Sequence, residues 1–260
     1  MYEIHETDQE GALLPLLAAD RAWCAYALCD LDPRHRAGAR YIVALEGRRP
    51  RGVALLYTLP DQVVLFLHGR DRATEAILET LKDAPPDVML SVRLNDLPAV
   101  GRRYEVLRWW TMRRMAIVPN GLAEPRPVDA RIEPLSTAHA GAVRALFNER
   151  SDAVYYDTML ADDTYVGAWI DGALVAIAGT HIVSWRYGIA AVGNVYTRPE
   201  YRGRGLAQAT THAVVDGLGR RGVRDIVLNV NEQNTPAVAA YRRLGFQDHG
   251  PFAEGTARLR

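Results

Sequence analysis

The chain has 260 residues, of which 31 are Lys or Arg and 31 are Asp or Glu, so its formal net charge is zero. Its hydrophobic fraction is 48%, and its length suits one large domain or two small ones, each able to bury a core. The balanced charge argues against nucleic-acid binding through a broad basic face. No apolar run reaches membrane-spanning length, and the N-terminus lacks the apolar core of a signal peptide. We therefore expect a cytoplasmic protein without a membrane partner.

The cysteines and histidines do not suggest a metal or disulfide framework. The only 2 cysteines, Cys24 and Cys29, lie in one predicted helix. The 7 histidines show no metal-ligand spacing with them. We expect no metal cofactor and no disulfide.

The first half alternates strands and helices, which we assign from apolar runs and from helical spacing of apolar residues. Its predicted elements are a helix at 11–30 that Pro15 breaks or starts, strands at 41–46, 52–59 and 62–68, a helix at 71–82, a strand at 87–93, a short helix at 96–103, and a hairpin-like pair or one long strand at 104–118. Proline and glycine are dense at 119–127, which indicates a linker. We therefore divide the chain into domains at 1–118 and 129–260, joined by a linker at 119–128.

The second half repeats this alternation. Its predicted elements are a strand at 130–134, a helix at 136–150 capped by Ser136, a helical segment at 152–161, strands at 165–170, 173–183 and 189–197, a helix from Arg204, a strand at 225–230, a helix capped by Asn234 or Thr235, and a final hairpin from Phe246. Short matches between the halves, such as 41–47 with 165–172, have two interpretations, a tandem duplication or chance.

The stretch from Val195 to Ala207 combines a strand end, a basic glycine-containing turn and a helix start. Pro199 ends the strand because it has no N–H to donate. Gly203 and Gly205 then stand where backbone N–H groups are free and no Cβ blocks a ligand. This arrangement favours a phosphate or pyrophosphate site, although a solvated basic turn is the alternative.

A second stretch, 231–246, changes the balance between these interpretations. Arg202, Gly205 and Ala207 resemble the Arg/Gln-x-x-Gly-x-Gly/Ala pyrophosphate loop of the GCN5-related N-acetyltransferase (GNAT) family. Asn234, Ala237, Tyr241 and the run Leu244-Gly245-Phe246 resemble the last helix of that family. The resemblance covers roughly residues 130–260, and the two motifs occur in the family's order.

The resemblance implies an α/β (α+β) fold in which a mixed, mostly antiparallel sheet is flanked by helices. The first half has the element order of a GNAT domain, so we expect a tandem GNAT fold. After its third strand, however, the turn at 68–72 has one glycine in place of the full loop. We therefore expect the first copy to be degenerate and the second copy to be functional.

The same resemblance implies a cosubstrate, acetyl-CoA or another short acyl-CoA, and assigns residues to it. The pyrophosphate would lie on the backbone of Arg202, Gly203, Arg204, Gly205, Leu206 and Ala207, the pantetheine arm on Val195, Tyr196 and Thr197, and Asn234 would line the opposite wall. Tyr241 would act as general acid toward the leaving thiolate. From the residues alone, a core tyrosine on an amphipathic helix is the alternative for Tyr241.

The general base stays unassigned at this stage. His181 is a weak candidate because its ordinary pKa range suits the role, although an ordinary surface or core histidine is the alternative. Asn194, Asp157 and Glu200 are weaker candidates. In the family, acceptor specificity is set near residues 150–165 and 180–188 of this chain, where Tyr155, Tyr156, Tyr165, Trp185, Arg186 and Tyr187 suit a small polar amine.

These observations predict an acetyl-CoA-dependent N-acetyltransferase that acts on a primary amine of a small molecule or amino acid, as a monomer or homodimer. The alternatives are a protein acetyltransferase and an acyl-CoA-binding regulatory or scaffold module without turnover. A nucleotide-binding loop ranks last, because the P-loop Gly-Lys-Ser/Thr and the dinucleotide Gly-x-Gly-x-x-Gly are both missing.

Overall fold

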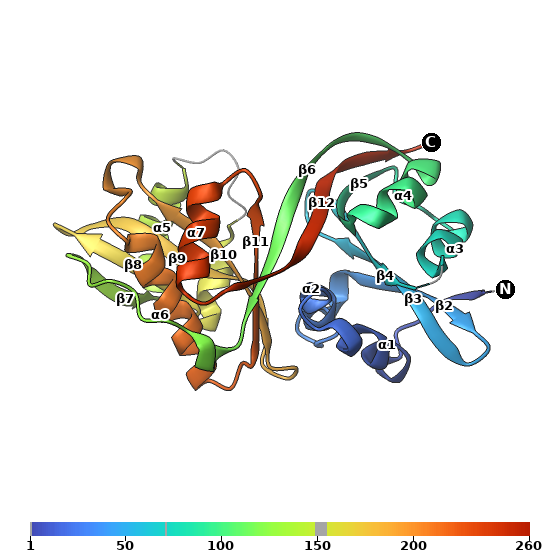
Figure 1. Cartoon of the computed structure of the whole chain (residues 1–260), viewed down its shortest axis with the longest axis horizontal. Helices are drawn as coiled ribbons and strands as arrows, with labels where there is room; N and C mark the ends of the chain where they lie inside the picture. Colours follow the sequence, from blue (N-terminus) through green and yellow to red (C-terminus); the bar gives the residue numbers. More distant parts are fainter. Residues whose placement is uncertain (1, 71, 149–154) are drawn as a thin grey trace. The chain divides into compact units, whose positions relative to one another are not determined.

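The computed structural model describes residues 2–70, 72–148 and 155–260. The chain forms two compact units (Figure 1). Unit 1 consists of Met1–Arg114 with His249–Arg260, and unit 2 consists of Met115–Asp248. Each unit has a β-sheet with helices on both faces, which confirms the predicted α/β class.

Unit 1 contains one mixed sheet in the strand order β1-β2-β3-β4-β5-β12-β6. Its elements are β1 (Glu3–Glu6), α1 (Glu10–Leu17), η1 (Ala18–Asp20), α2 (Ala25–Cys29), η2 (Arg36–Gly38), β2 (Ala39–Glu46), β3 (Arg49–Thr58), β4 (Val63–Gly69), α3 (Ala73–Thr80), β5 (Asp87–Arg93), η3 (Leu94–Asp96), α4 (Leu97–Arg103) and most of β6 (Tyr104–Ile117) and β12 (Gln247–Leu259). Strands β4 and β5 are parallel and pair from Val64 opposite Met89 to Phe66 opposite Ser91.

The two faces of the unit 1 sheet carry different helices. Helices α3 and α4 pack on one face through Ile77, Leu78 and Val100, while α1 and α2 lie on the other. The predicted helix at 11–30 is interrupted, because the Asp20 carboxylate accepts a hydrogen bond from the Trp23 N–H at 3.1 Å and turns the chain between η1 and α2. At 104–117 the single long strand, rather than the hairpin-like pair, is observed.

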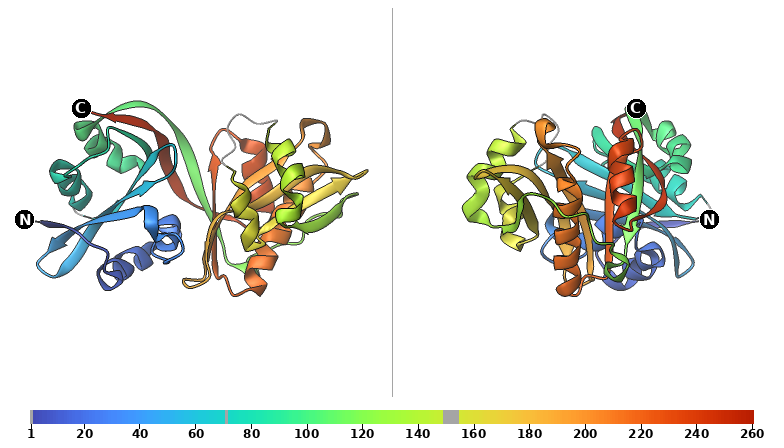
Figure 2. Two further views of the ribbon diagram at one scale, coloured as in Figure 1. Left: turned by 180° about the vertical axis from the view of Figure 1, so that it is seen from behind. Right: turned by 60° about the vertical axis from the view of Figure 1, so that its left-hand side comes forward.

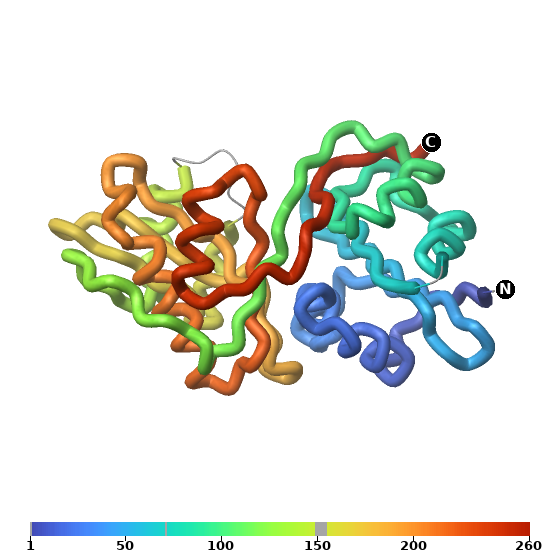
Figure 3. The backbone as a smooth tube through the Cα atoms, viewed as in Figure 1, coloured from blue at the N-terminus to red at the C-terminus, as the bar shows by residue number. Residues whose placement is uncertain are grey.

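The C-terminal strand β12 belongs to unit 1 and not to the half from which it leaves. It pairs antiparallel with β5, from Phe252 opposite Arg93 to Arg258 opposite Asp87. It also lies beside β6, as Figure 3 shows for unit 1. The predicted final hairpin is therefore wrong, since β12 completes the exposed edge of β5. For the same reason the observed units differ from the expected division at 118 and 129.

Unit 2 contains the other strands of one 12-stranded order, in which the end of β6 is followed by β11-β10-β9-β8-β7. Its elements are η4 (Pro119–Gly121), β7 (Arg131–Leu135), η5 (Thr137–His139), α5 (Ala140–Phe147), η6 (Asp157–Asp162), β8 (Tyr165–Ile170), β9 (Ala173–Ser184), β10 (Ile189–Thr197), η7 (Pro199–Tyr201), α6 (Leu206–Arg220), β11 (Asp225–Asn231) and α7 (Thr235–Arg243). The expected linker packs within this unit, where the Ala123 N–H donates to the Leu244 carbonyl oxygen at 3.0 Å.

Helices cover both faces of the unit 2 sheet as well. Helices α6 and α7 lie on one face, and α5 lies on the other, as the opposite views in Figures 1 and 2 show. The α6 side buries Val214, Val215 and Leu218, and the α5 side buries Val143 and Leu146. The predicted helical segment at 152–161 lies partly outside the described residues, and its described part from Asp157 is a 3-10 helix. None of the helices described is both long and apolar enough to cross a bilayer.

Candidate active site

Strand β10 separates from its parallel neighbour β11 halfway along its length. The pairing runs up to Val192 opposite Leu228, although β10 continues to Thr197 and β11 to Asn231. Within the described chain, the later backbone groups of β10 therefore have no partner on β11. The predicted cosubstrate residues Val195, Tyr196 and Thr197 lie in this separated half.

A tight loop joins β10 to α6. Gly203 and Gly205 have φ angles of +77° and +81°, in the left-handed region that glycine adopts without steric cost. Gly205 is also the N-cap of α6, and no side chain of the described residues caps this helix. The first N–H groups of α6, from Leu206 onward, are thus available together with the positive end of the helix dipole. Such a helix start can hold an anion like a pyrophosphate.

Both arginines of this loop are exposed, but they are oriented by different contacts. Arg202 Nε donates to the Thr197 carbonyl oxygen at 3.2 Å, which fastens the loop to the end of β10. The Arg204 guanidinium carbon lies 5.1 Å from the centroid of the Tyr201 ring. Each arginine therefore keeps a positive charge close to the two glycines.

Helix α7 is fixed against the first turn of α6. Gln208 Nε2 of α6 donates to the Ala240 carbonyl oxygen at 3.2 Å, so the neighbouring Tyr241 is positioned relative to the loop. The Tyr241 ring is half-buried and meets Phe246 edge-on at 6.0 Å between centroids. Asn234 caps α7, since its Oδ1 accepts a backbone N–H at 3.3 Å in the first turn. Of the two predicted caps, Asn234 is the one observed.

Two buried polar atoms flank the separation of β10 from β11. Thr197 Oγ1, at the end of β10, and Asn229 Oδ1, directly after the last paired residue of β11, have no hydrogen-bond partner among the described residues. A buried polar atom left in this state costs roughly 1–3 kcal/mol. The pantetheine arm of an acyl-CoA carries amide N–H groups and hydroxyls that can satisfy such atoms. The residues present therefore fit an acyl-CoA. Thr197 is among the residues predicted from the sequence, whereas Asn229 was not identified there.

The pairing of β9 with β10 contains a β-bulge that sets the position of His181. The register shifts between Ala191 and Val192, which leaves His181 of β9 as the extra residue. Its exposed ring lies over Gly193 of β10, where an added Cβ would be 2.3 Å from His181 Nε2. Bulges of this kind commonly redirect a side chain near an active site. His181 is thereby brought to the strand that carries the predicted cosubstrate residues.

A second register shift follows two residues later, between Gly193 and Tyr196. Asn194 and Val195 stand opposite a single residue of β9, and Asn194 has a φ of +53°. This left-handed conformation is uncommon for a residue with a side chain, although asparagine tolerates it best. A glycine–asparagine pair inside an apolar strand is a sequence signal for a bulge.

Asn194 ties this bulge to strands β8 and β9. Its Nδ2 donates to Tyr165 Oη at 2.8 Å, and the Tyr165 hydroxyl donates to the Thr180 carbonyl oxygen at 3.0 Å. Burial raises the pKa of Tyr165, and the Asn194 hydrogen bond offsets this only in part, so the hydroxyl stays protonated. The Thr180 hydroxyl is in turn 2.7 Å from that of Thr164. The sequence placed Tyr165 in the acceptor region, whereas the structure shows it buried within this network.

The remaining base candidates are less well placed. Asp157 is ion-paired with Arg144. Glu200 is exposed in η7, directly before the anion-binding loop. Asn194 has its amide hydrogen-bonded to Tyr165, and an amide is not a base at neutral pH. His181 is therefore the best-placed candidate among these four.

The predicted acceptor residues fall into different environments. Residues 150–154 lie outside the described chain. The Tyr155 ring packs 5.1 Å from that of Phe147, and burial together with Asp157 raises the pKa of Tyr155 to about 12. Trp185 is covered by the Arg221 guanidinium, 3.8 Å from its ring centroid, while Tyr156 is 40% exposed. The described acceptor region therefore offers phenol groups and a covered indole rather than a cluster of charges.

Comparisons with known proteins agree with this geometry. Residues 133–246 match the model of the acetyltransferase (GNAT) family. A mycothiol acetyltransferase of Saccharomonospora viridis is 42% identical over 65 residues, which are 24% of this chain and 21% of that protein. A mycothiol acetyltransferase of Streptomyces griseus is 26% identical over 262 residues, which are 93% of this chain and 78% of that protein. The first of these matches therefore spans only about a fifth of the relative's length.

Solved structures extend the similarity to the whole chain. A GCN5-related N-acetyltransferase from Sphaerobacter thermophilus has a TM-score of 0.65 at 18% identity and covers 98% of this chain and 95% of its own. A tandem GNAT protein from the clavulanic acid biosynthesis pathway has a TM-score of 0.63 at 17% identity, with coverage of 99% and 98%. At these identities the likeness establishes the fold.

The family model and the solved structures thus point to the same fold, one from the sequence of residues 133–246 and the other from the whole chain. Residues 133–246 are similar in sequence to the acetyltransferase (GNAT) family, and the whole chain has the fold of a tandem GNAT protein.

Proposed function

We propose that this protein transfers the acetyl group of acetyl-CoA to a primary amine of a small molecule or amino acid, by direct attack in a ternary complex. The observation that carries the proposal is the separation of β10 from β11 beside the uncapped start of α6. The unsatisfied Thr197 and Asn229 atoms support it, because amide groups of the cosubstrate would satisfy them. Unit 1 is then a degenerate copy that holds no second acetyl-transfer site.

In the proposed reaction, backbone N–H groups of the bulged segment around Tyr196 polarise the thioester carbonyl and stabilise the oxyanion. The neutral amine nitrogen attacks the carbonyl carbon, so that a C–N bond forms and the C–S bond breaks. Tyr241 donates its phenolic proton to the departing sulfur. No nucleophilic side chain is required, because the amine attacks directly.

We assign the general base to His181, which accepts the amine proton directly or through one water. Its position over Gly193, beside the bulge, supports this assignment. A neutral imidazole can accept a proton through the lone pair of one ring nitrogen. The Asn194–Tyr165 hydrogen bond acts as a positioning contact, because it holds the bulged backbone in its left-handed conformation.

A small-molecule acceptor is supported by the relatives, which are named for acetylation of mycothiol. The acceptor region adds phenol groups from Tyr155 and Tyr156, which suit hydrogen bonding to a polar amine. The acceptor itself is to be found by screening.

Turnover by the purified full chain tests the proposal. The protein would be incubated with acetyl-CoA and a panel of primary amines and amino acids, with free-thiol release and product mass as readouts. We expect release of CoA together with an N-acetylated amine. Binding of acetyl-CoA without turnover of any amine would favour the regulatory module, and absence of binding would overturn the transferase.

The pH profile of kcat/KM tests the base separately. Wild type should lose activity at acidic pH, where a general base is protonated. In His181→Gln this acidic limb should disappear and the plateau should fall by about 10²-fold. His5→Gln, which changes an exposed histidine of unit 1, serves as the matched control. An unchanged acidic limb in His181→Gln would assign the base elsewhere.

A further inference from the structure

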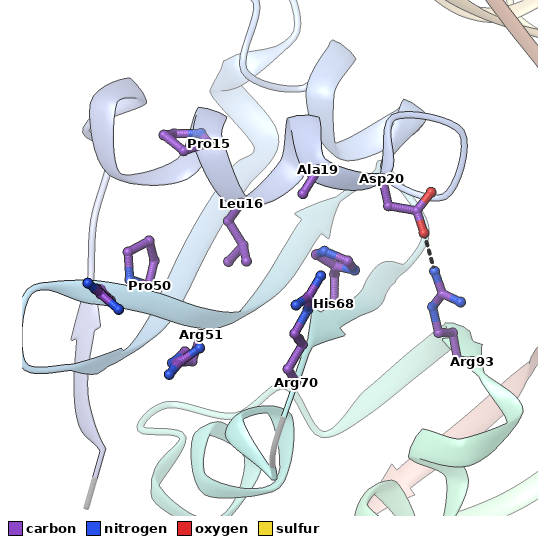
Figure 4. A pocket seen from close by; sticks show the side chains of 11 residues that line it. Pro15, Leu16, Ala19, Asp20, Pro50, Arg51, His68, Arg70 and Arg93 are labelled. Carbon is purple, nitrogen blue, oxygen red and sulfur yellow. Dashed lines mark hydrogen bonds and ion pairs between the residues drawn. The ribbon is translucent and has the colours of Figure 1, made fainter.

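Unit 1 contains a pocket of its own, with a volume of about 590 Å³ (Figure 4). It is built by α1 and η1 and by the ends of β3, β4 and β5. Its lining residues are Pro15, Leu16, Ala19, Asp20, Arg49, Pro50, Arg51, His68, Gly69, Arg70 and Arg93. Figure 4 shows Leu16 extending from α1 toward the strands that carry Arg51 and His68. All of these residues belong to unit 1, so the pocket is separate from the candidate active site.

The charge of this pocket is unbalanced. Four guanidinium groups line it, against the Asp20 carboxylate and the nearby Glu46. Asp20 is ion-paired with Arg93 at 2.5 Å, and Glu46 with Arg51 at 2.6 Å. Asp20 also contacts His249 at 2.8 Å, and Glu46 also feels the charge of Arg49. Four guanidinium groups against these two carboxylates leave the pocket with an excess of two positive charges.

The two remaining guanidinium groups belong to Arg49 and Arg70. Both residues are exposed, and neither side chain has a close ion-pair partner among the described residues, although the charge of Arg49 lowers the pKa of Glu46. Arg70 is nevertheless held in place by its backbone, because its N–H donates to the Arg51 carbonyl oxygen at 2.9 Å. Unpaired arginines beside a cavity are well suited to bidentate recognition of phosphate or carboxylate.

Trp23 is hydrogen-bonded to the end of β4, next to the residues of that strand that line the pocket. Its indole Nε1 donates to the Leu67 carbonyl oxygen at 3.1 Å, and Leu67 follows the last residue of β4 that pairs with β5. The Arg93 guanidinium stacks on the same indole at 4.7 Å. The position that the separated strands offer in unit 2 is therefore filled by a side chain in unit 1. A long pantetheine arm has no place there.

We propose that this pocket binds a small organic phosphate monoester, with the phosphate held by Arg49 and Arg70, independently of the acyl-CoA site of unit 2. A phosphate monoester carries a charge of about −1.5 to −2 at pH 7, which matches the uncompensated charge. The aliphatic part of the lining, from Pro15, Leu16 and Pro50, provides contact for the organic group. His68 also lines the pocket, and burial lowers its pKa. The negative charge of a bound dianion would raise that pKa.

Calorimetric titration of the full chain with phenyl phosphate tests the site. The double variant Arg49→Gln/Arg70→Gln should bind at least tenfold more weakly than wild type, or about 1.4 kcal/mol. It is expected to fold, because both side chains are exposed. Arg48→Gln is the matched control, since Arg48 is exposed in the same turn but does not line the pocket. Its affinity should stay within about twofold of wild type.

Two further measurements separate this site from the cosubstrate site. In Gly203→Glu, which blocks the loop of unit 2, phenyl phosphate should bind as in wild type, and acetyl-CoA should not displace it. NMR titration should show the pKa of His68 rising on addition of phenyl phosphate in wild type but not in the double variant. The proposal is overturned if wild type does not bind the probe, if the double variant binds it equally well, or if acetyl-CoA competes in Gly203→Glu.

Discussion

Units 1 and 2 each contain a parallel strand pair that separates toward its end, but they use the separation differently. In unit 1, β4 pairs with β5 only up to Phe66, and the Trp23 indole occupies the next position by bonding to the Leu67 carbonyl. In unit 2, β10 pairs with β11 only up to Val192, and beyond it Asn229 Oδ1 is buried without a partner in the described chain. One separation is filled by the protein itself, and the other retains unmet hydrogen-bonding capacity.

The two units also differ in the connection that follows the first strand of each parallel pair, β10 in unit 2 and β4 in unit 1. In unit 2, residues 198–205 lead into the 15-residue helix α6 through two glycines with positive φ. In unit 1, only residues 70–72 separate β4 from the 8-residue helix α3. A short connection cannot present several free N–H groups to a pyrophosphate. Two local features therefore distinguish the two units. Unit 2 has the glycine-containing loop at 198–205, and unit 1 has the Trp23 indole at the end of its parallel strand pair.

The largest effect on acetyl-CoA binding is expected from blocking the unit 2 loop. Gly203→Glu places a carboxylate and a strained backbone where the pyrophosphate is proposed to bind, so the Kd for acetyl-CoA should rise at least ~100-fold. Gly217→Glu adds the same charge within α6, where a Cβ meets nothing within 4 Å. This control should bind acetyl-CoA like wild type. Equal binding by wild type and Gly203→Glu would mean that the loop is not the anion site.

Removal of the proposed acid should separate chemistry from binding. Tyr241→Phe keeps the ring that packs against Phe246 but removes the proton donor, so kcat should fall by about 10²–10⁴-fold with little change in the Kd for acetyl-CoA. The control is Tyr57→Phe, which removes the hydroxyl of a half-buried tyrosine in unit 1 and should leave kcat unchanged. An undiminished kcat in Tyr241→Phe would make this residue a packing tyrosine.

Removing the Trp23 indole from the end of the β4–β5 pair should destabilise unit 1 and leave the cosubstrate site intact. Trp23 is 2% exposed, and Trp23→Ala should cost about 3–5 kcal/mol of unfolding free energy, measured by urea titration. Trp109→Ala, at a position 45% exposed, should cost less than about 0.5 kcal/mol. If Trp23→Ala proved neutral, the indole would not be the element that closes this strand pair.

The features that could be predicted from the sequence are those fixed by neighbouring residues. The glycines of the loop, the Asn234 cap and the order of strands and helices all depend on local conformational preferences. The role of Trp23 was not predictable, since its partner Leu67 lies far away in the sequence. The pairing of β12 with β5 was missed for a similar reason, because strand exchange is decided by which edge is open. The location of His181 depends on a register shift, which one sequence does not specify.

The smallest effect concerns the charge state of the unit 1 pocket. Burial lowers the pKa of His68, and the charge of Arg93 lowers it further. Because the pKa in the folded state lies below the unfolded value of about 6.5, the unfolded chain binds more protons as the pH falls. The stabilisation by neutral His68 is therefore present above pH about 6.5 and is lost as the pH falls through the folded pKa. Urea unfolding in phosphate-free buffer at pH about 7.5 and 5.5 should show a larger loss of stability for wild type than for His68→Gln. Equal losses would mean that the pKa of His68 is the same in the folded and the unfolded chain, so that burial in the pocket does not disfavour the charged imidazole.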